Sequence, residues 1–131
     1  MRRVMPLPRA LPALPFGIRV LRDAVIVIAC IAAGDALGGL PYGSGPADPR
    51  MVQVFQAVLG TLGFALVAFH ATSRRALHVA LTALVIAVLV AVPVATGGYH
   101  AFWWVVELVK LGLMALLGAA LALLLERLLR A

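Results

Sequence analysis

The sequence has no asparagine, one cysteine and few acidic residues. Asp and Glu together number 5, and charged residues make up 12% of the 131 positions. One cysteine cannot form an intramolecular disulfide or a CxxC metal site, so Cys30 is expected to serve in helix packing. No GxSxG, HExxH or phosphate-loop motif occurs, which leaves little for catalysis to use. We therefore expect a protein that is not an enzyme and needs neither a metal nor a cofactor.

Apolar residues dominate what is present. They make up 64% of the chain, and the mean hydropathy is +1.09, far from the balance of a soluble domain. A net charge of +6 would suggest nucleic-acid binding in a soluble protein, but here the arginines stand between hydrophobic runs and report membrane topology instead. The composition predicts an integral membrane protein whose first partner is the lipid bilayer, with no nucleic-acid partner.

Four apolar runs cover roughly 23–40, 51–71, 76–96 and 101–125. Each is close to the ~20 residues that a helix needs to cross ~30 Å of hydrocarbon. Because the connecting loops are short, consecutive spans must be antiparallel neighbours. The sequence thus predicts an all-α integral membrane protein, an up-down bundle of four transmembrane helices. Residues 19–131 form this single domain, and residues 1–18 form a Pro- and Arg-rich cytoplasmic lead whose prolines prevent a regular helix.

The basic residues predict an orientation for this bundle. Of the 11 basic residues, nine lie in the N-terminal segment, the 74–75 loop and the C-terminus, whereas Arg50 is alone on the opposite side. The positive-inside rule therefore places both termini in the cytoplasm of a bacterial-type inner membrane. The outer interface then receives a belt of four aromatic residues, Tyr42, Tyr99, Trp103 and Trp104.

Small residues recur every fourth position in several spans, and residues at this spacing share one helix face. Such faces let two backbones approach closely, which helices need in lipid because hydrocarbon supplies no hydrophobic drive for their association. We expect helix packing at two stripes, namely Cys30, Gly34 and Gly38 in the first span and Ala83, Ala87 and Ala91 in the third.

Polar residues interrupt the spans at similar depths, counted at ~1.5 Å of rise per residue. Below the outer ends of their spans, Glu107 lies about 5 Å and Lys110 about 10 Å deep. Asp35 lies about 9 Å deep, and Gln53 and Gln56 lie about 5 and 9 Å deep. The five residues predict a polar layer in the outer third of the membrane. It is either interhelical glue or an outward-facing site for a substrate or ion, unless Lys110 simply snorkels to water.

The inner halves of the spans contrast with this layer, since Thr82 is their only expected hydroxyl and no charge is expected there. His70 and His78 flank the 74–75 loop at the inner headgroup boundary. Two imidazoles on neighbouring helices are the arrangement of axial haem ligands, so a haem- or quinone-binding anchor is a minor alternative.

Two function classes follow. The first is an accessory or structural subunit of a larger inner-membrane transport or respiratory complex, indicated by the small size, the small-residue faces and the lack of a catalytic set. The second is a compact oligomeric transporter or channel that uses Asp35, Gln56, Glu107 and Lys110. The partner is accordingly another membrane protein or further copies of this chain.

Overall fold

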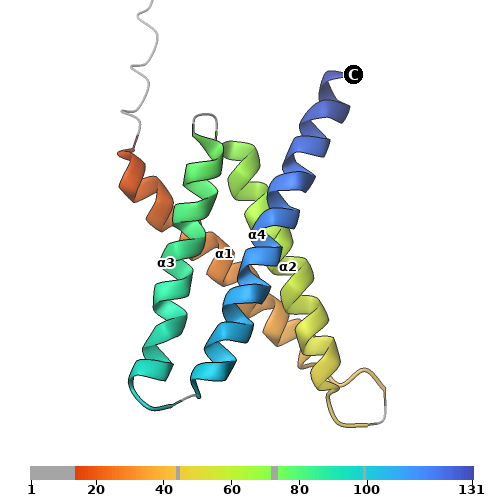
Figure 1. Ribbon diagram of the computed structural model, residues 1–131. Coiled ribbons are helices and arrows are strands. Elements are labelled where there is room, and N and C mark those ends of the chain that lie inside the picture. The colour runs from red at the N-terminus through yellow and green to blue at the C-terminus, as the bar shows by residue number, and fades with distance from the viewer. Residues whose placement is uncertain (1–13, 44, 72–73, 99) are drawn as a thin grey trace, which may run out of the picture.

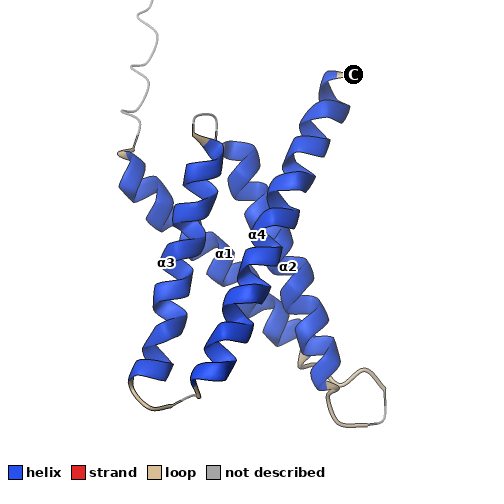
Figure 2. Ribbon diagram, viewed as in Figure 1, coloured by secondary structure: helices blue, strands red, loops and turns tan. Residues whose placement is uncertain are grey.

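The computed structural model describes residues 14–43, 45–71, 74–98 and 100–131. These residues form helices and connecting loops, without strands (Figure 2). The helices are α1 (Phe16–Gly38), α2 (Pro49–His70), α3 (Arg75–Ala95) and α4 (Ala101–Arg130). The expectation of an all-helical chain is confirmed. Most of the predicted N-terminal lead, and Tyr99 of the predicted aromatic belt, lie outside the described residues.

Three of the helices, α2, α3 and α4, are long and apolar enough to cross a membrane, so the chain has the character of a membrane-embedded helical protein. The exception is α1. Its 23 residues are long enough, but any 18-residue stretch of it holds at least three charged side chains. The charges are Arg19, Arg22, Asp23 and Asp35. Between Asp23 and Asp35 the helix is free of charge for a length of about 16 Å.

The helix ends differ from the predicted spans mainly in α1 and α4. Helix α1 begins directly after Pro15, so residues 16–22, expected to precede the span, are helical. Helix α4 continues to Arg130, past the predicted end at residue 125, because no glycine or proline interrupts "LERLLR". Helix α2 begins with a proline at its first position, and the Asp48 side chain accepts a hydrogen bond from the Arg50 amide at 2.9 Å, a normal N-terminal cap.

Arginines gather at one end of the bundle. The start of α1, the α2–α3 loop and the end of α4 lie at this end (Figure 1). We call it the Arg-rich end; in the described residues it carries Arg19, Arg22, Arg74, Arg75, Arg127 and Arg130. The α1–α2 and α3–α4 loops lie at the opposite end, which we call the Trp end after Trp103 and Trp104. Helix α1 runs obliquely behind the other three.

The closest packing joins α1 to α2, and α2 in turn packs against α4, while α3 contacts α1 and α4. The face of α1 that carries Cys30, Gly34 and Gly38 lies against α2. A Cβ added at Gly34 would lie 2.7 Å from the carbonyl oxygen of Phe55, closer than van der Waals contact allows. Glycine is thus what permits the two backbones to touch.

The second predicted stripe lies on α3. Ala83 and Ala87 pack against the hydrophobic core, and Ala91 is half-buried. The core itself is drawn from all four helices, with Val27 and Phe64 fully buried within it. Many leucines and valines point outward instead, as is expected of helices whose outer faces meet lipid rather than water.

Candidate functional site

Lys110 is the centre of a polar network near the Trp end. Its ammonium donates hydrogen bonds to Glu107 Oε1 at 2.8 Å, to Gln56 Oε1 at 2.9 Å and to Gln53 Oε1 at 3.3 Å. Glu107 precedes Lys110 by one helical turn of α4, so this contact is local. The two glutamines belong to α2, so the other contacts join two helices.

The network reaches the first helix through Gln56, whose Nε2 donates to Oδ1 of Asp35. The link between Lys110 and Asp35 therefore runs through the Gln56 amide, and three helices take part. The five residues expected to share a layer lie in one chain of hydrogen bonds. Glu107 is paired with Lys110, and Asp35 adds a second carboxylate through Gln56, so the network has a formal excess of one negative charge.

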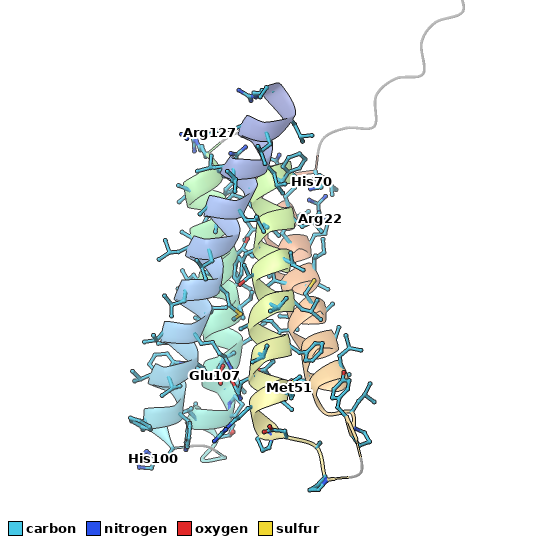
Figure 3. The ribbon with its side chains drawn as sticks, turned by 90° about the vertical axis from the view of Figure 1, so that its right-hand side faces the viewer. Arg22, Met51, His70, His100, Glu107 and Arg127 are labelled. Carbon is cyan, nitrogen blue, oxygen red and sulfur yellow. The ribbon has the colours of Figure 1, made fainter. Side chains whose placement is uncertain are left out.

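Burial is uneven within this network. The Lys110 side chain is 19% exposed and that of Glu107 is 42% exposed. A lysine that snorkels would extend its ammonium into the interface, whereas the Lys110 ammonium lies among three acceptors on two helices. Figure 3 shows Glu107 in the half of the molecule away from Arg22, His70 and Arg127.

A pocket of about 470 Å³ adjoins the network. All four helices contribute to its lining, and α4 supplies Trp103, Trp104 and Glu107. Gln56 borders it from α2, so the network and the pocket share two residues. Leu89 and Pro93 border it from α3. Proline has no N–H to donate to the carbonyl four residues earlier, so α3 offers a carbonyl acceptor at Leu89.

A second polar contact lies towards the Arg-rich end and was missed by the sequence analysis. His78 Nε2 lies 2.6 Å from Oδ2 of Asp23, and each residue is 4% exposed. Arg22 Nε donates to the other oxygen, Oδ1, at 2.8 Å. Thr82 Oγ1 donates to the His78 carbonyl at 2.9 Å.

The sequence did not predict this buried pair, since Asp23 was expected at the start of the first span and His78 at the headgroup boundary; the depth of the pair in a membrane stays a prediction. The early start of α1 at Phe16 places Asp23 two turns inside the helix rather than at its end. Asp23 lies seven residues after the start of α1 and His78 three residues after the start of α3, so counting from the helix ends does not pair them.

The two histidines proposed as haem ligands have different environments. His78 is buried against Asp23, whereas His70 is exposed and its Nδ1 lies 2.9 Å from the Leu66 carbonyl oxygen. A bis-histidine haem site needs both rings to face one iron. The His78 ring is directed to Asp23 in this structure, and the haem-binding alternative stays a prediction.

One further ion pair fixes α4 at the Arg-rich end. The Arg75 guanidinium donates to both carboxylate oxygens of Glu126, with Nη1 3.1 Å from Oε2. This bidentate geometry is the strong form of an arginine–carboxylate contact. It depends on contact between α3 and the last turns of α4, which the predicted span, ending at residue 125, did not include.

Comparison with known proteins adds no functional information. No protein-family model, curated protein or solved structure matches the chain. The fold is that of a membrane-embedded helical bundle with two polar clusters between its helices.

Proposed function

We propose that this chain is a small non-catalytic integral membrane protein, an accessory or structural subunit of a larger inner-membrane transport or respiratory complex. The observation that carries the proposal is that the polar side chains within the bundle form hydrogen bonds between helices. Lys110 donates its hydrogen bonds to residues of α2 and α4, and the Gln56 amide donates to Asp35. Polar groups used in this way hold helices together in lipid.

We include α1 as a fourth span with both termini in the cytoplasm. A charge in the membrane is costly unless it is paired or reaches water. Asp23 is paired with His78 and Arg22, and Asp35 receives a hydrogen bond from Gln56. These partners reduce the cost of placing α1 across the bilayer. The arginines of the Arg-rich end favour the cytoplasmic side for that end.

A surface for a membrane partner is available on α4. Its 30 residues extend over about 45 Å, which exceeds the ~30 Å of bilayer hydrocarbon. Beyond Glu126, the side chains of Leu128 and Leu129 are 64% and 75% exposed. An apolar helix end of this kind supports contact with another integral protein.

The proposal is tested by purifying the tagged chain from its native membrane in a mild detergent and analysing the intact assembly by mass spectrometry. Stable recovery of a larger integral partner at fixed stoichiometry is expected. A Leu128→Glu, Leu129→Glu variant should lose that partner while keeping its own melting temperature. Recovery of the chain alone would contradict the accessory role.

A compact oligomeric transporter is the second candidate, and the 470 Å³ pocket beside Glu107 is the observation that favours it. Four helices alone can hardly enclose a complete pathway, so this function requires several copies of the chain. A homo-oligomer without other subunits, together with ligand flux in proteoliposomes, would favour this candidate over the first.

A further inference from the structure

We propose that the pocket beside Glu107 binds a lipophilic organic monocation, such as an amine or a quaternary ammonium group that carries a hydrocarbon substituent. This inference goes beyond the accessory role, because a subunit can hold such a ligand whether or not it belongs to a larger complex. Three features of the pocket carry the inference: its carboxylate, its aromatic side chains and its apolar walls.

One carboxylate borders the pocket. Glu107 lines it, and among the described residues no cationic side chain does. Lys110 instead lines a separate cavity of about 60 Å³ together with Glu107. The ammonium binds Oε1 of Glu107, and within the described residues Oε2 makes no hydrogen bond. The second carboxylate of the network, Asp35, does not line the pocket but is linked to it through Gln56, and Oε2 of Glu107 is the carboxylate oxygen that a monocation would meet.

Aromatic rings stand next to this carboxylate. Trp103 and Trp104 line the same pocket, and indole is the aromatic side chain that attracts cations most strongly through its face. Trp104 Nε1 lies 3.5 Å from the carbonyl oxygen of Ala87 on α3, which orients the ring across the α3–α4 interface. A carboxylate beside two indoles is a combination suited to a cation with a diffuse charge.

The apolar walls of the pocket favour a ligand that carries a hydrocarbon group. Most of the lining is apolar, and Val90 and Val94 of α3 belong to it with Leu89. The volume of about 470 Å³ is within the ~300–1,000 Å³ of small-molecule sites. A small inorganic ion would leave most of this space empty, whereas an organic cation would fill it. The Leu89 carbonyl, left without a donor by Pro93, can accept from an N–H of an amine.

The tryptophans make the test direct, because the chain has 2 tryptophans and both line the pocket. The purified full chain in lipid nanodiscs is titrated with benzyltriethylammonium while tryptophan emission is recorded. The anion 4-tert-butylbenzenesulfonate, of similar size, is the matched probe. Saturable binding of the cation and at least tenfold weaker binding of the anion are expected. Equal binding of both probes, or no saturable change with either, would overturn the proposal and indicate a pocket filled by lipid chains.

The variant Glu107→Gln keeps an acceptor for Lys110 but removes the charge, so the cation should bind roughly tenfold more weakly, the effect of ~1.4 kcal/mol. Glu126→Gln removes the same charge from the other end of α4 and should leave binding unchanged. Unchanged cation binding in Glu107→Gln would overturn the assignment. If that variant does not fold, the comparison of the two probes on the unaltered chain still decides the question. The complex-recovery experiment is independent, so either proposal can fail alone.

Discussion

His78 Nε2 lies 2.6 Å from the Asp23 carboxylate, and the two buried residues join α3 to α1. They are the pair through which the oblique first helix is fastened to the third near the Arg-rich end. Arg22 binds the second oxygen of the same carboxylate, so Asp23 has two partners and His78 Nε2 has one. Replacing Asp23 and replacing His78 should therefore change the stability by different amounts.

Asp23→Leu should lower the free energy of unfolding by about 1–3 kcal/mol, because a buried polar group is left without its partner. His78→Leu should cost less, since Arg22 still satisfies the carboxylate. The double variant should cost less than the sum of the single costs, because it leaves neither partner orphaned. Denaturant unfolding in detergent micelles measures all three. The exposed His70→Leu is the control, expected within about 0.5 kcal/mol of the parent. Additive costs for Asp23 and His78 would argue against the contact.

Gly34→Ala should destabilise the α1–α2 pair, because the new Cβ would lie 2.7 to 2.8 Å from backbone atoms of Phe55 and Gln56. Alanine ordinarily favours a helix over glycine by about 1 kcal/mol. Gly112→Ala in α4 is the matched control, since a Cβ there meets nothing within 4 Å, and this variant should be neutral or stabilised. Melting temperatures in one detergent compare the two.

Larger replacements extend the same test. Gly34→Leu and Gly38→Leu should disrupt the helix pair severely, whereas Ala29→Leu places the same side chain at an exposed position of α1 and should do less. Equal losses at Gly34 and Ala29 would mean that the close approach of α1 and α2 contributes nothing specific.

The four helices could be predicted because each apolar run is long and bounded by turn residues or charges. Their ends were less predictable. Nothing in the pattern around Arg19 and Arg22 marks the start of α1 except Pro15. A charged turn before an apolar run is equally compatible with a non-helical segment outside the membrane. The oblique course of α1, which brings Gly34 and Gly38 against α2, is a property of the packed structure.

The polar network was predictable at the level of depth, because rise per residue brings Asp35, Gln56 and Lys110 to one level. The route of the hydrogen bonds was not, since depth does not define which faces of the helices meet. The Asp23–His78 contact was missed because it needs the oblique course of α1. A single charge near a predicted helix end is easily assigned to the membrane–water interface, although the helix in the structure begins two turns earlier.

Topology is predicted from the arginines. A reporter enzyme active only in the cytoplasm should work when fused after Arg130 or inserted before Arg74, and should fail when inserted at residues 43–48. Nine basic residues bias three segments inward, and this bias sets the orientation of short-loop membrane proteins. Activity at residues 43–48 alone would reverse the orientation and place the Lys110 network in the inner leaflet.

Lys110→Leu should destabilise the bundle by about 1 kcal/mol or more, because Glu107 and two glutamines of α2 lose their shared donor. A lysine that merely snorkelled would give the opposite result, a neutral or stabilising change, since a charge would leave the lipid and orphan nothing.

The network itself is tested by double-mutant cycles on thermal stability in detergent. Lys110→Leu combined with Gln56→Leu should show a coupling above about 0.5 kcal/mol, the scatter of independent sites. Lys110→Leu combined with Asp35→Asn should show a weaker coupling, because that link passes through the Gln56 amide. Coupling energies within that scatter in both cycles would contradict the hydrogen-bond network. Strong couplings together with unchanged cation binding by the Lys110→Leu variant would show that Lys110 holds the helices together. Its ammonium would then stabilise the contact between α2 and α4 without affecting the affinity of the pocket for cations.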